Sequence, residues 1–421
     1  MKTTIKQYFE NRRKDDYQRE NYDSFLKKVK FSFAIPSIHI AGSNGKGQTA
    51  SFIASIYVEA GYKVGLFTSP YFASPCESIK VSNNEISEKE MSDIIDEYSH
   101  LFDKFKLSEF EILTFIAFEH FKKSYCDVVV IECGMGGLID ATNIFTPNLS
   151  IITSISMEHT YYLGESLSEI AYQKAGIIKE EVPVLTCEYH SDGLNVVSKI
   201  AKENNSKVIL LGTPVNERIV DEKYIFTYGN YVDVSIQTLS LMSVKDACFA
   251  LDAVEILKDI LPVSRESIYL GLSKVKVSCR MDVIKEKQSS IIVDGAHNPE
   301  AISSLVKDVM RYPLHRPIHI VFTCFKDKNI ENMLSSLNLL TNDITLTTFT
   351  HPRAREYDDY FLYVDDYKYN DDHIEAIQAY LNEYPKDIIL VCGSLAFAFM
   401  VKDEILKGTY VFKDEELPNQ D

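Results

Sequence analysis

The sequence predicts an α/β protein with two domains, each built on a mostly parallel sheet covered by helices. Three observations predict it: short apolar runs recur along the 421 residues, helix-length segments separate them, and the series restarts after the polar stretch IKEKQSS at 284–290. Runs that are apolar on both faces are typical of parallel strands buried between helices, and this length suits two domains. We therefore expect a first domain over 1–283 and a second over 284–421.

The strands of the first domain are expected at the apolar runs. They begin with the apolar segment at residue 38 and continue in KVGLFTSP at 63–70, CDVVVIECG at 126–134, LSIITSIS at 149–156 and VPVLTC at 182–187. Between about 205 and 243 the pattern becomes short and alternating, in KVILLG, YIFTYG and YVDVSIQT, which predicts an antiparallel patch. A helix is expected from Val244 to Ile260.

The second domain has its own strand series. SIIVDG, PIHIVFTCF, DITLTTF and DIILVCGS alternate with helix-like segments, which predicts a smaller Rossmann-like α/β domain. The acidic tail KDEELPNQD is expected to be a frayed end.

Composition excludes several classes of function. The net charge of -17 opposes binding to nucleic acid or to an anionic membrane, because both favour a basic surface. The eight cysteines form no CxxC pair, no signal peptide begins the chain, and no apolar stretch approaches the length of a membrane span. We expect a cytoplasmic protein with reduced thiols.

The segment IHIAGSNGKGQT at 38–49 has the pattern of a phosphate site. Gly42, Gly45 and Gly47 allow backbone N–H groups to turn around an anion, and Lys46 adds a positive charge where a helix begins. The strict P-loop pattern is incomplete, because Ile40 stands where its first glycine is expected and Gly47 follows the lysine. An ordinary glycine turn is the alternative. The first domain is thus predicted to be P-loop NTPase-like and to bind a nucleoside triphosphate.

Three polar residues follow strands at the edge where α/β sheets bind ligands. Ser69 follows KVGLFT, Glu132 ends CDVVVI, and His159 lies shortly beyond LSIITSIS. Together with phosphate oxygens and water, this set suits Mg²⁺. Taken singly, each residue has a structural alternative: a turn serine, a strand-end acid and a surface histidine.

Two further groups are candidates for chemistry. Lys174 lies in a helical segment, EIAYQKAGIIK, whose apolar neighbours argue against a simple solvated charge. Asp294, His297 and Asn298 follow the first strand of the second domain, at its ligand-binding edge. A turn with a helix-capping asparagine is the alternative for that group.

With these motifs assembled, the sequence resembles the folylpolyglutamate synthase and dihydrofolate synthase family of Mur-type ATP-dependent amide ligases. The resemblance runs from about residue 35 to 400. It is carried by HIAGSNGKGQT at 39–49, Thr68-Ser69-Pro70, Glu109-Phe110-Glu111, ECGMGGLIDATN at 132–143, Glu158-His159-Thr160-Tyr161, QKAGIIK at 173–179, DGAHNP at 294–299, FKDK at 325–328, Arg353-Ala354 and Gly393-Ser394-Leu395.

The resemblance implies a Mur ligase central domain followed by a Rossmann-like ligase domain. It implies that ATP phosphorylates a carboxylate and that the amine of L-glutamate then attacks the acyl phosphate. The implied substrates are pteroate or folate, L-glutamate and ATP, with one or two Mg²⁺ ions, and the implied protein is a monomer. Phosphoryl transfer of this kind depends mainly on positioning and charge stabilisation.

Site residues are carried over from the family motifs position by position. The implied catalytic residues are Lys46, Lys174 and His297. The implied ATP contacts are Gly42, Ser43, Asn44, Gly45, Lys46, Gly47, Thr49, Asp246, Arg280 and Asp294. The implied pterin contacts are Ser108, Glu109, Phe110, Glu111, Ile139, Asp140 and Ala141. The implied metal ligands are Ser69, Glu132, His159 and a carbamylated Lys174.

Six positions depart from the family pattern: Gln48, Tyr71, Ser78, Leu138, Gln173 and Asp246. Several of them lie where substrate contacts are expected. The acceptor carboxylate therefore stays open at this point, with two alternatives: a diverged Mur-type ligase that acts on another carboxylate, and a nucleotide-binding regulator without catalysis.

Overall fold

The computed structural model describes residues 4–10, 12, 19–276, 278–312 and 316–413, and the chain forms two compact units. Unit 1 comprises Met1–Glu217, Ile225–Ile236 and Val244–Val275; unit 2 comprises Arg218–Tyr224, Gln237–Ser243 and Lys276–Asp421. The boundary expected near residue 284 falls inside strand β12 (Asp282–Glu286), which belongs to unit 2. Most of the acidic tail lies outside the described residues.

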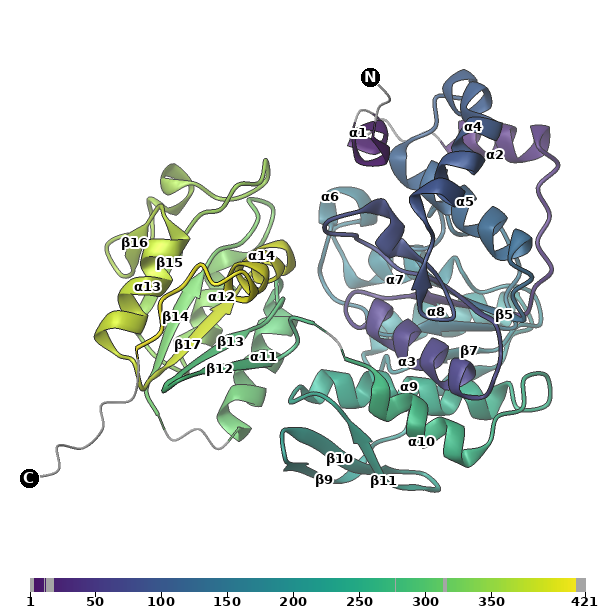
Figure 1. The fold of residues 1–421 in the computed structure, drawn as a ribbon. Coiled ribbons are helices and arrows are strands. Elements are labelled where there is room, and N and C mark those ends of the chain that lie inside the picture. Colours follow the sequence, from purple (N-terminus) through teal and green to yellow (C-terminus); the bar gives the residue numbers. More distant parts are fainter. Residues whose placement is uncertain (1–3, 11, 13–18, 277, 313–315, 414–421) are drawn as a thin grey trace, which may run out of the picture. The chain divides into compact units, whose positions relative to one another are not determined.

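Unit 1 contains an eight-stranded sheet in the order β4-β3-β2-β5-β1-β6-β7-β8. Two of its strands, β5 and β7, are labelled in Figure 1. Its strands are β1 (Ser37–Ala41), β2 (Val64–Phe67), β3 (Ile79–Val81), β4 (Asn84–Glu85), β5 (Val128–Glu132), β6 (Leu149–Ile152), β7 (Val184–Thr186) and β8 (Val208–Leu210). Along the row β2-β5-β1-β6-β7-β8, neighbouring strands pair parallel. At the other edge, β3 pairs antiparallel with both β2 and β4. Every residue of β1 and β5 is buried, which explains why these runs are apolar on both faces. The parallel sheet is confirmed.

The helices of unit 1 connect and cover these strands. They are α1 (Ile5–Glu10), α2 (Arg19–Lys28), α3 (Lys46–Glu59), α4 (Glu88–Lys104), α5 (Glu109–Lys123), α6 (Thr160–Leu163), α7 (Leu167–Ala175), α8 (Ser191–Glu203) and α10 (Arg265–Lys274), with most of α9 (Leu241–Ile256). Capping boxes begin α4, α5 and α7, at Ser87, Ser108 and Ser166.

One part of the expected antiparallel patch is wrong. KVILLG forms β8, which pairs parallel with β7, and its alternation arises because β8 is the edge strand of the large sheet and is only partly covered. The rest of that region forms a separate three-stranded sheet in the order β11-β10-β9, from β9 (Val215–Val220), β10 (Lys223–Tyr228) and β11 (Tyr231–Ile236).

Unit 2 contains a six-stranded sheet in the order β12-β13-β17-β14-β15-β16. Its strands are β12 (Asp282–Glu286), β13 (Ser289–Val293), β14 (Ile318–Phe322), β15 (Ile344–Thr347), β16 (Lys368–Asn370) and β17 (Ile388–Cys392), and its helices are α11 (Pro299–Arg311), α12 (Ile330–Leu337), α13 (His373–Glu383) and α14 (Leu395–Leu406). All pairings are parallel except β12 with β13. The four expected strands are confirmed.

The polar stretch at 284–290, where the boundary between the domains was expected, lies within unit 2. It forms the antiparallel turn between β12 and β13, with Lys285 opposite Ser290. Because β12 is an edge strand, its solvent side is polar, and the sequence therefore looks like a connection.

Candidate active site

The glycine-rich segment forms a turn between β1 and α3. Gly45 has φ +86°, a left-handed conformation that glycine adopts without strain, and α3 begins at the next residue, Lys46. A Cβ on Gly45 would lie 2.2 Å from Oδ1 of Asp246, and one on Gly42 would lie 1.9 Å from Oγ1 of Thr153. The turn is therefore tightly enclosed, and its backbone leads into a helix N-terminus, as a phosphate site requires.

The end of β6 holds this turn in place. The Asn44 N–H donates to Oγ of Ser154 (2.9 Å), Thr153 Oγ1 donates to the Asn44 carbonyl (2.6 Å), and the Ser43 N–H donates to the Ser154 carbonyl (2.9 Å). Nζ of Lys46 donates to the Gly42 carbonyl (2.9 Å), so the ammonium group lies over the turn.

The side chains of Thr49 and Asp246 pack against the turn. Thr49 is fully buried, and its hydroxyl donates to Oδ1 of Asp246 over 3.4 Å. Asp246 is itself only 3 % exposed. The structure thus places both residues beneath the turn, and Gln48, the nearby departure from the family pattern, is also buried.

Two of the three expected Mg²⁺ ligands are brought together. The backbone N–H of Ser69 donates to Oε2 of Glu132 over 2.9 Å. A Cβ on Gly47 would lie 2.9 Å from the same oxygen. This carboxylate therefore also adjoins the turn at residues 42–47, which we name the phosphate turn after its predicted role. His159 is the N-cap residue before α6 and has φ 44°, which is uncommon for a residue other than glycine.

Lys174 lies next to an acid that the sequence did not single out as a site residue. Its Nζ donates to Oε1 of Glu158 over 2.7 Å, and its side chain has no exposed surface. Burial by itself raises the pKa of Glu158, but the nearby Lys174 and Lys46 outweigh it and hold the pKa at about 2. Burial lowers the pKa of Lys174. These three charges, Lys46, Glu158 and Lys174, therefore lie close enough to interact.

The segment 134–143 forms a compact loop that follows β5. The Asp140 carboxylate accepts hydrogen bonds from the backbone of Met135 (2.8 Å) and of Thr142 (2.9 Å), so it organises the loop from inside. Burial raises its pKa. Ile139 is 41 % exposed and Ala141 is buried, so Ile139 is the most accessible of the three expected pterin contacts in this loop.

The expected contacts at 108–111 lie at the start of α5. Ser108 and Glu111 form its capping box, in which the Ser108 N–H donates to Oε2 of Glu111 over 2.7 Å. Phe110 packs on the loop at 134–143, because a Cβ on Gly134 would lie 2.5 Å from its ring. Glu109 accepts a hydrogen bond from the hydroxyl of Tyr71.

In unit 2, Asp294 and His297 lie directly after β13. The buried Asp294 carboxylate accepts from the backbone of Met281 and Ala296, each over 2.7 Å. Burial raises its pKa, and Arg280 opposes that shift. Nδ1 of His297 is 2.8 Å from the Gly295 carbonyl, which fixes the ring.

Asn298 is a helix-capping residue, as the alternative interpretation of the sequence proposed. Its side chain accepts from the Ala301 N–H over 2.9 Å and caps α11, with Pro299 in the first turn.

Sequence reasoning missed several residues that hold the site. Arg19 donates to the carbonyls of Asp140 (2.6 Å) and Asn143 (3.2 Å) from more than a hundred positions away in the chain. No local pattern signals such a contact. Thr153 and Ser154, by contrast, directly follow β6, and polar residues at that end of a parallel strand are a signal from which they could have been predicted.

Comparisons with known proteins identify the family of this chain. The Mur ligase middle domain matches residues 40–247, and the Mur ligase glutamate ligase domain matches residues 279–395. The dihydrofolate synthase/folylpolyglutamate synthase of Bacillus subtilis is 31% identical over 382 residues, which cover 86% of this chain and 89% of that protein. The folylpolyglutamate synthase structure from Thermotoga maritima has a TM-score of 0.80 at 27% identity, covering 96% of both chains. A structure of E. coli FolC in complex with ADP has a TM-score of 0.83 at 27% identity, again covering 96% of both.

The two domain matches, together with the phosphate turn, define an ATP-dependent amide-forming ligase of the Mur type. Within that class, the chain belongs to the folylpolyglutamate synthase and dihydrofolate synthase family. No helix in the part of the chain that the structure describes is long and apolar enough to cross a membrane.

Proposed function

We propose that this chain ligates L-glutamate to dihydropteroate, to a folate, or to both, at the expense of ATP. The observation that carries the proposal is that Lys46 and Glu132 adjoin the turn at 42–47, and that the Glu158–Lys174 pair lies close enough to interact with Lys46. A module that only bound a nucleotide would not need a buried lysine and two carboxylates beside the phosphates. The names of the relatives support glutamate and a folate as substrates.

The reaction has two steps. A carboxylate oxygen of the acceptor attacks the γ-phosphorus of ATP, so the P–O bond to ADP breaks and an acyl phosphate forms. The amine of L-glutamate then attacks the acyl carbon, loses a proton, and expels inorganic phosphate as the amide forms. Lys46 and the backbone of 42–47 would bind the phosphates and stabilise the charge on the transferring group.

The residues present fit Mg²⁺. Ser69, Glu132 and His159 offer hydroxyl, carboxylate and imidazole, and the Glu132 carboxylate lies beside both Ser69 and Gly47. We propose that these three residues hold the ion, which would neutralise phosphate charge when bound. In unit 2, Arg280, Asp294 and His297 are proposed nucleotide contacts.

Carbamylation of Lys174 is a further part of the proposal. Burial lowers the pKa of Lys174, which increases the fraction of neutral amine that reaction with CO₂ needs. The carbamate would be negatively charged and would suit a second metal ion. Glu158 opposes it, since its carboxylate already neutralises the ammonium form.

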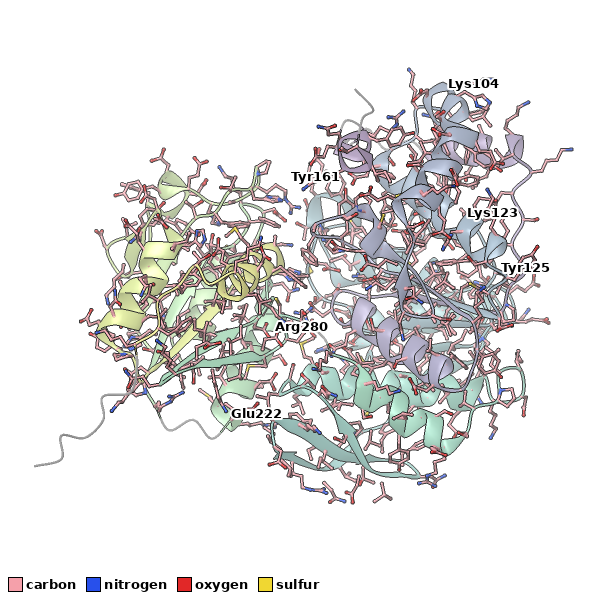
Figure 2. The ribbon with its side chains drawn as sticks, viewed as in Figure 1. Lys104, Lys123, Tyr125, Tyr161, Glu222 and Arg280 are labelled. Atoms are coloured by element: carbon pink, nitrogen blue, oxygen red, sulfur yellow. The ribbon has the colours of Figure 1, made fainter. Side chains whose placement is uncertain are left out.

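The test uses purified protein with ATP, Mg²⁺, L-glutamate and a panel of dihydropteroate, tetrahydrofolate and non-pterin carboxylates. We expect ADP release and a glutamylated pterin, seen by mass spectrometry. Lys46→Ala should lower the rate by about a hundredfold or more. Lys104→Ala, a surface lysine of unit 1 (Figure 2), should leave it unchanged. Size-exclusion chromatography of the same sample tests the proposed monomer.

Other outcomes would overturn the proposal in distinct ways. Turnover only with a non-pterin carboxylate would favour the diverged ligase, for which the exposed Leu138 in place of an arginine is the motivating feature. Tight ATP binding without ADP release for any acceptor would favour the regulator.

A further inference from the structure

His39 is a polar side chain in the centre of the eight-stranded sheet. It belongs to β1, where it lies opposite Ile131 of β5 and Ser150 of β6, and it has no exposed surface. Burial is the main cause that lowers its pKa to about 3, so the ring is neutral and carries one hydrogen. A buried imidazole needs hydrogen-bond partners, and its partners therefore indicate its role.

The hydroxyl of Thr142 connects His39 to Asp140. Nε2 of His39 lies 2.8 Å from Oγ1 of Thr142, and this oxygen lies 2.6 Å from Oδ1 of Asp140. The Asp140 carboxylate also accepts from the backbone N–H groups of Thr142 (2.9 Å) and Met135 (2.8 Å). Donors on three sides favour the ionised carboxylate, which can only accept. The Thr142 hydroxyl therefore donates to Asp140.

The direction of that bond assigns the tautomer of His39. The hydroxyl has one hydrogen, which points to Asp140, so its oxygen accepts from Nε2–H of His39. Nδ1 has no hydrogen-bond partner among the described residues, so no competing bond favours a hydrogen there. Sγ of Cys133 lies 3.1 Å from Nε2 and is a weaker second neighbour of the same hydrogen.

Packing alone does not account for a histidine at this position. The ring packs against Phe145, with centroids 4.9 Å apart, and an apolar side chain would make the same contact. A buried polar ring is costly unless it is hydrogen-bonded. The bond to Thr142 is therefore the feature that distinguishes histidine from leucine here.

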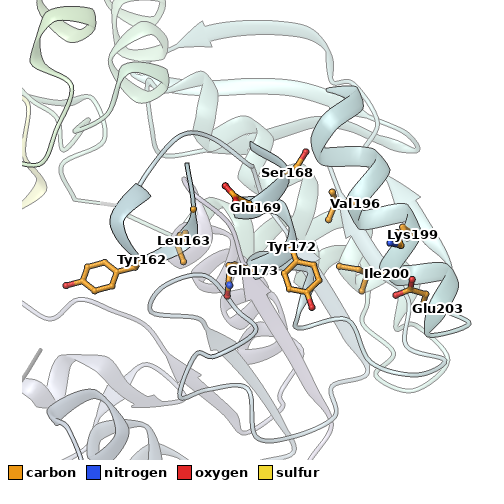
Figure 3. A pocket seen from close by; sticks show the side chains of 11 residues that line it. Tyr162, Leu163, Ser168, Glu169, Tyr172, Gln173, Val196, Lys199, Ile200 and Glu203 are labelled. Atoms are coloured by element: carbon orange, nitrogen blue, oxygen red, sulfur yellow. The ribbon is translucent and has the colours of Figure 1, made fainter. Parts of the chain in front are cut away.

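The loop at 134–143 carries this connection to the surface. Leu138 and Ile139 directly precede Asp140 and are 38 % and 41 % exposed. From the other side, Gln173 of α7, which Figure 3 labels, holds the loop through its carbonyl, which accepts from the Leu138 N–H over 2.7 Å. The two accessible side chains thus lie between internal anchors.

We propose that His39 is a positioning residue for the acceptor substrate: its Nε2–H orients the Thr142 hydroxyl, which orients the Asp140 carboxylate and with it the exposed part of the loop. This inference rests on the proposed function, in which the loop contacts the pterin. His39 touches no substrate, because its ring is fully buried. An acceptor that binds to an ordered loop loses less free energy in ordering it.

The first test needs no substrate. Hydrogen exchange of 134–143 should become about tenfold faster in His39→Leu and in Thr142→Val, which each remove one typical hydrogen bond of the connection. His39→Gln keeps an N–H near the position of Nε2 and should restore slow exchange. The double variant should exchange no faster than either single variant, because both break the same connection. His120→Leu, at a buried histidine of α5, is the matched control and should not change exchange of the loop.

The second test is steady-state kinetics with the pterin that the wild type glutamylates. His39→Leu and Thr142→Val should raise the KM for the acceptor by about tenfold and leave the KM for ATP within about twofold. Gly42, where the phosphate turn begins, is three residues from His39, so general damage to β1 would raise the KM for ATP as well. His39→Gln should recover most of the acceptor KM, and His120→Leu should leave both KM values unchanged.

Two results would overturn the positioning role. One is unchanged exchange of 134–143 in the variants, and Thr142→Val decides this even if His39→Leu does not fold. The other is an equal rise in both KM values, which would assign His39 to the stability of β1 alone. Failure of the proposed function is distinct, because it would appear in the wild type as the absence of any glutamylated pterin, before the variants are compared.

Discussion

Nζ of Lys174 lies 2.7 Å from Oε1 of Glu158, with the lysine side chain fully buried and the glutamate side chain 6 % exposed. Neither charge has water as an alternative partner, so each depends on the other. Both side chains also interact electrostatically with Lys46, the first residue of α3, so the pair links the stability of unit 1 to the candidate active site.

Glu158→Gln should destabilise unit 1 by about 3–5 kcal/mol, because it leaves a buried ammonium group without its counterion. The double variant Glu158→Gln with Lys174→Met should be less destabilised than the sum of the two single changes. Urea unfolding of the four proteins measures this coupling. Additive effects would show that the two side chains do not depend on each other.

The same pair predicts a loss of stability in acid. The folded Glu158 has a pKa of about 2, below its ordinary value of 4.5, so folding favours the carboxylate. Its contribution is complete above about pH 4.5 and is lost as the pH falls toward 2. In the Glu158→Gln variant, the urea concentration at the unfolding midpoint should fall less between pH 4.5 and about pH 2 than it does in the wild type. A variant that follows the wild-type slope would contradict the assignment.

Gly45→Ala should destabilise the phosphate turn and weaken ATP binding. The alanine would meet both a left-handed backbone at φ +86° and the Asp246 carboxylate, at 2.2 Å. Gly61→Ala is the matched control, because Gly61 has φ +89° but no atom within 4 Å of the added Cβ. Gly61→Ala should lower the free energy of unfolding by about 1–2 kcal/mol and leave the ATP affinity unchanged. Gly45→Ala should lower the free energy of unfolding by more than that, and it should also lower the ATP affinity. Equal effects in thermal melts and ATP titrations would show that crowding by Asp246 is unimportant.

Glu132→Gln should raise the Mg²⁺ concentration needed for ligation by about tenfold or more, because it removes the only charge among the three proposed ligands that is always negative. The glutamine oxygen still accepts from the Ser69 N–H, so the melting temperature should change little. Activity against Mg²⁺ concentration measures the effect, with exposed Glu180→Gln as the control. An unchanged Mg²⁺ requirement would remove Glu132 from the metal site.

Asp308 predicts a pH response within unit 2. Burial raises its pKa from 3.8 to about 7, although its carboxylate accepts from the Leu241 N–H and the Ser240 hydroxyl, both over 2.9 Å. The folded state therefore binds more protons than the unfolded state between these values, and stability falls as the pH rises from about 4 to about 7. Asp308→Asn should remove this slope and be more stable than the wild type at about pH 8. Urea midpoints across pH measure it, and exposed Asp365→Asn should keep the wild-type slope.

The strands were predicted well, because a strand buried on both faces has to be apolar regardless of its neighbours. β1, β5 and β6 are examples. The predictions failed for two edge strands. The run at 207–212 was expected in an antiparallel patch but pairs parallel at a sheet edge, and the polar run at 284–290 was expected at the domain boundary but is part of a β-hairpin. Edge strands expose one side, so their composition resembles that of loops.

The sequence by itself determined the two-domain α/β class and the place of the glycine-rich turn between a strand and a helix, because buried strands must be apolar and a left-handed turn favours glycine, and both requirements are local. Only the tertiary structure decided that Glu158 neutralises Lys174, that Asp246 lies beneath Gly45, and that Arg19 holds the Asp140 loop. The reason is physical: these contacts join residues on different elements, and their strength depends on burial and distance, which the order of the residues does not specify.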